Sequence, residues 1–260
     1  MGIQGKSLHI MTPMYGGQCT HNYHESMISL TLALAHNKVP FSLSYNVNES
    51  LISRGRNRLA DNYLKNNSHT HALLVDADIG FDPRDVFAML EHDLDIAGAG
   101  CVKKGLRWDR VQRAIKKNGR EYTNDEMARI AGDYIFNWLP GTVGPQKFHL
   151  AEPLEVHNIG TGLMMVRRNV FETYKEKYPD RWYDSKGADP ADNPGPVHDF
   201  FRVGVNYESR QYDSEDYWFC MDCRDIGFKV WMLPWMKTSH AGTYTFRGDM
   251  VAVSALVGEL

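Results

Sequence analysis

The sequence lacks the features that would place it among membrane or secreted proteins. No apolar run is long enough to span a bilayer, and residues 1–6 lead into a strand-like segment without the apolar core of a signal peptide. The 4 cysteines do not form a secreted disulfide framework. A net charge of -3 gives no overall attraction to nucleic acid or to a membrane. We therefore expect a globular protein of the cytoplasm with no membrane segment.

Two of the cysteines, Cys220 and Cys223, have the spacing of half a zinc site. No second Cys or His pair of matching spacing follows them, so a metal site is the weaker interpretation. We expect both residues to be thiols on a helix in a reducing compartment.

The 260 residues fit one large α/β domain or two small ones. No internal repeat and no linker divides the chain, so a single domain over residues 1–260 is the better prediction. The first hundred residues alternate between strand and helix patterns. Strands are predicted at 7–12, 41–47, around Leu73 and at 95–99, and helices at 21–36, 51–67 and 83–92. This rhythm predicts βαβ units and a mostly parallel, mixed central sheet in a Rossmann-like domain.

The remainder of the chain is less regular. Further strand patterns lie at 156–166, interrupted by a Gly-Thr-Gly segment, and at 229–233 after a short helix that starts near residue 219. Residues 183–200 are dense in Asp, Pro and Gly, which predicts a mobile surface loop without a core of its own.

Paired carboxylates at the end of an apolar run are the most informative local feature. Residues 73–75 are Leu-Leu-Val, a pattern typical of a strand buried on both faces, and Asp76 and Asp78 follow directly. The carboxyl end of such a strand opens into the crevice where α/β sheets bind their ligands. Two carboxylates there suit Mg²⁺ or Mn²⁺ holding a diphosphate. The alternatives are solvated loop acids or a helix cap, since Asp82-Pro83 has the pattern of a cap.

Several short motifs in a fixed order extend this interpretation to most of the chain. They are Thr12-Pro13, Arg56-Asn57, Asp76-x-Asp78, the glycine-containing segment 158–164, the segment 214–219 with Gly227 and Pro234 downstream, and the segment 239–242. Taken together, these motifs resemble the GT-A glycosyltransferases, especially family 2-like members. The resemblance implies a GT-A fold, with the donor-binding half in about residues 1–100 and the acceptor-binding half in about residues 101–260. It also implies an enzyme that moves a sugar from a nucleotide-diphosphate sugar to a hydroxyl.

The resemblance implies that Asp78, helped by Asp76, coordinates Mn²⁺ or Mg²⁺ on the donor diphosphate. His240 stands where the family often adds a C-terminal histidine to that metal. A neutral imidazole is a reasonable third ligand beside two carboxylates, more so for Mn²⁺ than for Mg²⁺. A lone histidine is more often structural, and that alternative stays open.

Glu215 and Asp216 stand at the position of the general base in inverting family members. The resemblance implies that Asp216 accepts the proton of the acceptor hydroxyl, with Glu215 beside it in the catalytic pair and Asp213 in reserve. The same acids after Ser214 also fit the first turn of a helix, where carboxylates complement the helix dipole. Both interpretations can hold together.

The resemblance also supplies candidates for donor binding. Tyr15, in the first loop, would stack on the nucleobase, and Arg56 would touch the donor unless its helix face is solvated. Glycines beside a ligand let the backbone approach closely, and Arg247 would neutralise the departing diphosphate as a lid closes. The complete set is Thr12, Pro13, Tyr15, Arg56, Asn57, Asp76, Gly160, Gly162 and Arg247.

A basic run at residues 103–120, in which Asp109 is the one acid, bears on the acceptor. Five of its cations recur at helical spacing and predict either a solvated helix face or a phosphate-binding stripe, with Trp108 free to stack on a base or sugar. These five are Lys103, Arg107, Arg110, Arg113 and Lys117. Small enzymes of this kind resemble phage-type transferases that glycosylate hydroxymethylated bases in duplex DNA. That acceptor, in a host cytoplasm, is the leading one, and a glycan or a small molecule is the alternative.

Two other functions stay open. Surface-polysaccharide synthesis uses similar transferases, although those often carry a membrane segment that is absent from this sequence. A nucleotidyltransferase would use a similar metal-held triphosphate, but it usually has a basic residue in the first loop, and residues 13–18 have none.

Overall fold

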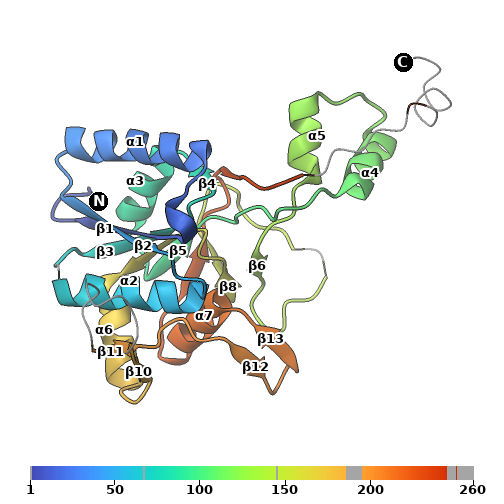
Figure 1. Ribbon diagram of the computed structural model, residues 1–260. Helices are drawn as coiled ribbons and strands as arrows, with labels where there is room; N and C mark the ends of the chain where they lie inside the picture. Colours follow the sequence, from blue (N-terminus) through green and yellow to red (C-terminus); the bar gives the residue numbers. More distant parts are fainter. Residues whose placement is uncertain (1, 67, 145, 186–194, 245–249, 251–260) are drawn as a thin grey trace.

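The centre of the molecule is a seven-stranded mixed sheet with helices on both faces (Figure 1). The computed structural model describes residues 2–244 and 250, except 67, 145 and 186–194. Across the sheet the strands are β2 (Phe41–Val47), β1 (Leu8–Met14), β3 (His71–Val75), β9 (Leu163–Arg167), β5 (Ile96–Gly98), β14 (Val230–Met232) and β7 (Leu154–Val156). Strands β9 and β7 run antiparallel to their neighbours, and the other five share one direction. The predicted mixed and mostly parallel sheet is confirmed.

Helices cover both faces because the strands are apolar on both sides. Helices α1 (His21–His36) and α3 (Pro83–His92) pack on one face, and α2 (Ile52–Asn66), α6 (Arg168–Lys177) and α7 (Glu215–Asp225) pack on the other (Figure 1). Alternate residues of β3 enter the two cores: Leu73 faces α1 and α3, whereas Leu74 faces the opposite helices. All five residues of β3 are buried, as its sequence predicted.

The smaller elements lie mainly at the carboxyl edge of the sheet and beyond it. Helices α4 (Trp108–Asn118) and α5 (Asn124–Ala131) pack on each other and stand away from the sheet (Figure 1). We call these two helices the α4–α5 lobe. The short antiparallel pairs are β4 (Ile79–Phe81) with β15 (Thr238–His240), β6 (Phe136–Asn137) with β8 (Asn158–Ile159), β10 (Trp182–Asp184) with β11 (Pro196–His198), and β12 (Gly204–Asn206) with β13 (Gln211–Asp213). A short 3-10 turn, η1 (Tyr15–Gly17), follows β1. None of the helices in the described ranges is long and apolar enough to cross a membrane.

The prediction of a loop without a core at residues 183–200 is wrong at both ends of that segment. Strands β10 and β11 pair there, and Val197 and Phe200 are buried. The Pro, Gly and Asp content masked the inward-facing apolar residues, which find their partners on α2 and α6. The middle of the segment, residues 186–194, lies outside the described residues.

The thiols of Cys220 and Cys223 are buried on α7 and form no disulfide, as expected. Burial raises the pKa of the Cys220 thiol to about 12, so this thiol stays protonated. The prediction of structural thiols agrees with this environment.

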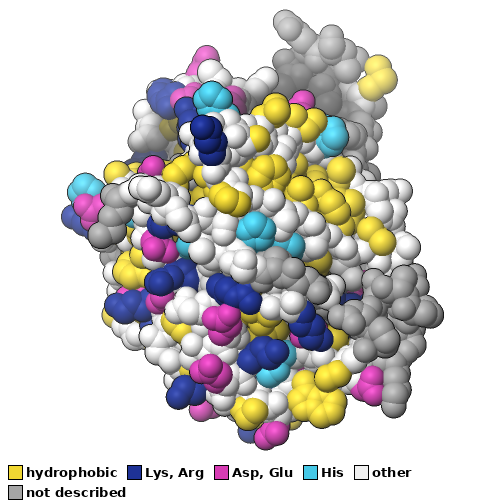
Figure 2. All heavy atoms as spheres, turned by 90° about the vertical axis from the view of Figure 1, so that its left-hand side faces the viewer, with side chains coloured by type: hydrophobic (Ala, Val, Ile, Leu, Met, Phe, Trp, Pro, Cys, Tyr) yellow, Lys and Arg dark blue, Asp and Glu magenta, His cyan; other side chains and the backbone are white. Residues whose placement is uncertain are grey.

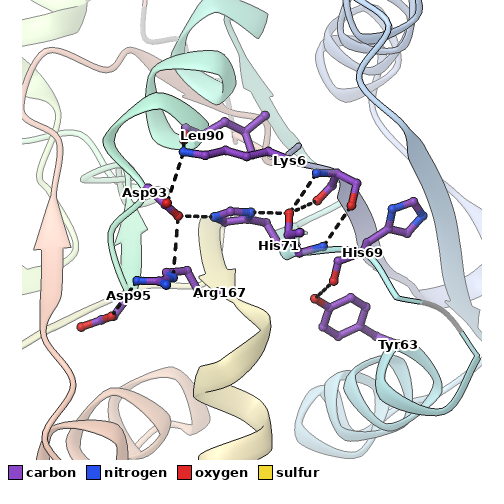
Figure 3. A network of polar contacts seen from close by, with 10 residues as sticks. Lys6, Tyr63, His69, His71, Leu90, Asp93, Asp95 and Arg167 are labelled. Atoms are coloured by element: carbon purple, nitrogen blue, oxygen red, sulfur yellow. Dashed lines mark hydrogen bonds and ion pairs between the residues drawn. The ribbon is translucent and has the colours of Figure 1, made fainter. Parts of the chain in front are cut away.

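A polar network joins strand ends on the side of the sheet opposite Asp76 (Figure 3). His71 Nε2 lies 3.0 Å from Asp93 Oδ1, Lys6 Nζ lies 3.4 Å from Asp93 Oδ2, and Arg167 Nε lies 3.7 Å from Asp93 Oδ1. Burial lowers the pKa of His71, although the neighbouring Asp93 carboxylate acts in the opposite direction. The network closes the amino ends of the strands and leaves the carboxyl ends open for a site.

Charged side chains of both signs are interspersed on the face shown in Figure 2, which lies on the side away from the α4–α5 lobe. This mixture agrees with the small net charge of -3.

Buried histidines predict that acid weakens the fold well before the carboxylates titrate. Burial lowers the pKa of His9 and of His198 to about 4, and it also lowers the pKa of His71. In the unfolded chain each of these three histidines would titrate near 6.5. Below that pH the unfolded state therefore binds protons that the folded state does not bind. Stability is therefore full above pH 6.5 and falls as the pH drops toward 4, and at pH 5 the loss from His9 alone is about 2 kcal/mol.

Urea denaturation at pH 7.5 and pH 5 measures this loss. The variant His9→Gln should show a smaller difference between the two pH values, and His36→Gln, a change at an exposed helix end, serves as the control. Equal differences for wild type and His9→Gln would contradict the assignment.

Candidate active site at the carboxyl edge of the sheet

Asp76 and Asp78 lie where β3 ends and the chain turns into β4. The Asp76 N–H donates to the Gly162 carbonyl at 3.1 Å, and the Ile79 N–H donates to the Asp76 carbonyl at 3.0 Å. These bonds fix the turn, and the two carboxylate side chains are 30% and 29% exposed. The buried strand therefore delivers two partly exposed acids to the crevice, as its sequence predicted.

His240 comes to the same place because β15 pairs with β4 and sets His240 opposite Ile79. Its Nδ1 lies 2.7 Å from the Val102 carbonyl, and its Nε2 lies 3.4 Å from Asp78 Oδ1. A carbonyl accepts only, so Nδ1 carries a proton, and in the neutral ring Nε2 then turns a lone pair toward Asp78. Metal-binding histidines are commonly oriented by such a bond at the other ring nitrogen.

Lys104 also reaches this place, a contact that no sequence pattern predicted. Its Nζ lies 2.5 Å from Asp78 Oδ2. Lys104 was one cation among several in the basic run and does not fall on its predicted stripe. Within the described ranges, no three His, Cys, Asp or Glu side chains converge closely enough to hold a metal as they stand.

Arg56 is the buried cation of the site. Its side chain is 4% exposed, one guanidinium nitrogen lies 2.6 Å from Asp76 Oδ1, and another pairs with Glu215 Oε1. Burial opposes its charge, but Asp76 and Glu215 outweigh that effect and raise the pKa of Arg56. The alternative of a solvated helix face is excluded for this residue.

Asn57 is buried beside Arg56, but its side chain serves the fold. Its amide nitrogen donates to Asp199 at 2.7 Å, and its amide oxygen accepts from the Phe201 N–H at 2.7 Å. These bonds hold the segment after β11 against α2. Asn57 does not line the hollow described next.

A hollow of about 260 Å³ brings most of the predicted site residues together. Its walls come from α2, the β3–β4 turn, the Gly-Thr-Gly segment, the start of α7 and the end of β15. The predicted residues among its lining are Arg56, Asp76, Gly160, Gly162, Glu215, Asp216 and His240. Asp78 lies at its edge through the contact with His240.

Asp216 presents one oxygen to this hollow. Its Oδ1 accepts hydrogen bonds from the Ser214 hydroxyl and, at 2.9 Å, from the Tyr217 N–H. Its Oδ2 faces Gly160 and accepts no hydrogen bond from the described residues. Ser214 does occupy the N-cap position of α7 as predicted, but its hydroxyl orients Asp216 and bonds no backbone N–H.

Close packing explains why Gly160 and Gly162 have no side chain. A Cβ at Gly160 would lie 3.2 Å from Ile135 and 3.4 Å from Asp216 Oδ2, and a Cβ at Gly162 would lie 3.0 Å from Cys101 Sγ. Gly162 therefore lets the strand end pack on Cys101, whereas Gly160 keeps the space in front of Asp216 open.

The first-loop residues lie at the end of β1, next to β3 in the sheet. Thr12 is fully buried, with its hydroxyl 2.8 Å from that of Tyr23, while Pro13 is half-buried and Tyr15 is 70% exposed. The Tyr15 ring is available to a ligand, and the Thr12 side chain is used within the fold. Arg247 lies outside the described residues.

A larger cleft, of about 1510 Å³, opens beside the hollow, between the sheet and the α4–α5 lobe. His240 lines both spaces, and Lys104 lines the cleft next to it. The lining of the cleft includes several aromatic rings, among them those of Trp108, Tyr134, Phe136, Phe148 and Trp235.

The predicted basic stripe is less positive than its sequence indicated. Arg107 and Arg113 each bond Asp109, and Arg110 lies 3.1 Å from Asp133. Asp133 is remote in the sequence, so the pattern at 103–120 could not reveal it.

No protein-family model and no curated protein matches the chain. Among solved structures it is similar to A197 from STIV, with 13% identity and a TM-score of 0.45, over 92% of this chain and 86% of that one. It is similar to GalNAc-T7, solved with UDP, GalNAc and Mn2+, with 10% identity and a TM-score of 0.44, over 90% of this chain and 43% of that one. It is also similar to S. aureus TarS, with 12% identity and a TM-score of 0.36, over 88% of this chain and 58% of that one.

The chain thus spans less than two thirds of the GalNAc-T7 and TarS chains. It has the mixed α/β fold that the resemblance in its sequence implied. With identities of 10 to 13% and TM-scores below 0.5, these similarities carry no argument about activity.

Proposed function

We propose that the protein is a metal-dependent glycosyltransferase that uses a nucleotide-diphosphate sugar as its donor. The observation that carries this proposal is the hollow itself. There Asp76, at the end of β3, shares one small space with Asp216, whose Oδ2 accepts no hydrogen bond from the described residues, and Asp78 contacts His240 of the same lining.

Asp76, Asp78 and His240 would hold Mn²⁺ or Mg²⁺. The donor set fits such an ion, because the His240 Nε2 lone pair and Asp78 Oδ1 face each other at 3.4 Å and a cation between them satisfies both. When bound, the metal would neutralise charge on the donor diphosphate as it departs. Small movements would complete the ligand set: Lys104 leaves Asp78, whereas Arg56 stays paired with Asp76 Oδ1.

Asp216 would act as the general base on the acceptor hydroxyl. The Ser214 hydroxyl and the Tyr217 N–H hold Oδ1, so the orientation of the carboxylate is fixed while Oδ2 remains free to take the proton. Glu215 instead neutralises buried Arg56, so within the predicted pair of Glu215 and Asp216 it has a positioning role. A base on the face opposite the leaving diphosphate gives inversion at the sugar carbon.

The donor nucleotide would lie at the ends of β1 and β3, with Pro13 and Tyr15 beside the base. Arg56 would keep Asp76 oriented toward the metal through their 2.6 Å ion pair. The acceptor would enter by the cleft, which meets the hollow at His240.

A hydroxymethylated base extruded from duplex DNA is the acceptor that we favour, because exposed rings such as Trp108 and Tyr134 can stack on it. Because acids neutralise the arginines of α4, fewer free cations are available to contact DNA phosphates than the sequence pattern indicated. A salt titration of DNA binding separates it from a glycan or small-molecule acceptor.

The proposed activity is tested by a screen of sugar nucleotides for release of nucleoside diphosphate, with and without Mn²⁺. Metal-dependent release from one donor supports the proposal. A chain that binds no sugar nucleotide with either metal would overturn it.

Asp78→Ala is expected to abolish transfer and weaken donor binding while the fold survives, because the side chain lies partly exposed at a strand end. Asp76→Ala should be nearly as severe, and His240→Ala milder. EDTA should abolish wild-type turnover, whereas the control variant Asp125→Ala, at an exposed acid that lines neither the hollow nor the cleft, should behave like wild type. Turnover undiminished by EDTA contradicts the metal assignment.

A further inference from the structure

The two carboxylates at the end of β3 are neutralised by two cations, one with a buried side chain and one with a largely exposed side chain. Asp76 pairs with Arg56, whose side chain is 4% exposed and is also bound to Glu215. Asp78 pairs with Lys104, whose side chain is 46% exposed. A buried guanidinium held by two acids is a fixed part of the site. An exposed ammonium on a flexible stem exchanges at little cost.

The backbone around Lys104 is anchored, although its side chain is not. The Lys103 N–H donates to the Asp133 carbonyl at 2.8 Å, and the Gly105 N–H donates to the Lys103 carbonyl at 2.8 Å. The lysine stem then passes directly over Gly242, where a Cβ would lie only 2.9 Å from Lys104 Cδ. This close approach guides the ammonium past His240 to Asp78.

A divalent cation on Asp78 and the Lys104 ammonium cannot both keep this position. Unit charges of like sign 4 Å apart repel by about 4 kcal/mol at an effective dielectric constant of 20, and the metal carries two charges. The phosphate oxygens of a donor held on the same metal offer the displaced ammonium a new partner within reach of its stem.

We propose that Lys104 is an exchangeable counter-ion, which neutralises Asp78 until a divalent cation binds and then pairs with the phosphate oxygens of the nucleotide donor. The inference rests on the proposed function, since it assigns Lys104 to the same metal and donor. It makes Lys104 a positioning residue that couples the order of binding: the metal binds first and thereby releases a cation for the diphosphate.

The test measures binding and needs no turnover. Mn²⁺ affinity is measured by the electron paramagnetic resonance signal of free Mn²⁺, first without nucleotide. Affinities for UDP, GDP, ADP and CDP are then measured by calorimetry at saturating Mn²⁺. In Lys104→Met, Mn²⁺ alone should bind about fivefold more tightly because its competitor is gone. The best nucleoside diphosphate should bind about tenfold more weakly.

Two further variants separate this role from a structural one. Lys103→Met removes the neighbouring cation, which also lines the cleft, and should change neither affinity. Gly242→Ala should push the Lys104 stem away and tighten Mn²⁺ binding in the same direction as Lys104→Met. A general loss of structure would weaken the binding of both Mn²⁺ and the nucleoside diphosphate. Only an exchanging counter-ion changes these two affinities in opposite directions.

Three results are decisive against the inference. If Lys104→Met binds Mn²⁺ as wild type does or more weakly, Lys104 does not compete with the metal. If its affinity for the nucleoside diphosphate is unchanged, Lys104 does not contact the phosphates. In both cases wild-type binding of Mn²⁺ and nucleotide leaves the proposed function intact. If the wild type binds neither ligand, the proposed function fails and the inference fails with it.

Discussion

Arg56→Met is expected to lower the free energy of unfolding by about 3 kcal/mol and to abolish turnover. The change leaves the buried Glu215 carboxylate and the strand-end Asp76 without their shared cation, and removal of one partner from a buried ion pair costs about 3 to 5 kcal/mol. The lower end of that range applies because Asp76 is 30% exposed and water replaces part of what it loses. Urea denaturation followed by circular dichroism measures the change.

Two controls test the mechanism of this loss. Arg54→Met, on the same helix, removes a 44% exposed arginine from its ion pair with Glu49, which keeps Arg58 as a partner, and should cost less than about 1 kcal/mol. The double variant Arg56→Met with Glu215→Met should recover part of the stability, since it removes the stranded charge. Equal stabilities for Arg56→Met and Arg54→Met would show that the buried pair contributes nothing special.

Asp216→Asn is expected to reduce turnover by about 10² to 10⁴-fold with little change in donor affinity or stability. The amide oxygen of the new side chain can still accept from the Ser214 hydroxyl and the Tyr217 N–H. Only the basic oxygen that faces Gly160 is replaced, so the variant removes the proton acceptor and keeps the geometry. Single-turnover rates and donor binding constants, measured side by side, separate the two effects.

Asp213→Asn is the matched control, since Asp213 lies on β13 and does not line the hollow. An inverted anomeric configuration in the product should accompany full activity. A product that keeps the configuration of the donor, or a variant within tenfold of wild type, would remove Asp216 from the role of base.

Strand β3 is the part of the fold that the sequence predicted best. Three apolar residues followed by spaced carboxylates predicted a strand buried on both faces, and β3 is buried throughout and ends beside the hollow that Asp76 lines. The Asp82-Pro83 cap was also readable, and the Asp82 side chain does accept from the Arg84 N–H at 2.9 Å. These features depend on neighbours in the chain, where a local pattern carries the information.

A local pattern does not record which acids lie beside a run of cations. Arg107, Arg110 and Arg113 formed a stripe in the sequence, but Asp109 and Asp133 neutralise them in the fold. Thr12 and Asn57 were interpreted as donor-binding residues, but their polar atoms bond Tyr23, Asp199 and the backbone of Phe201. A polar residue in a motif can serve the fold or a ligand, and only its partners distinguish the two.

The sequence by itself determined the order of strands and helices along the first hundred residues, the buried β3 strand, and the two acids at its end. Hydrophobic periodicity and turn residues act within a few positions, so a local pattern carries this information. The tertiary structure alone decided which charges meet. Arg56 and Glu215 are 159 positions apart, and Lys104 and Asp78 are 26 apart. Such pairs form because the crossover connections of the sheet bring the carboxyl ends of several strands to one edge, and no local pattern records which side chains arrive there together.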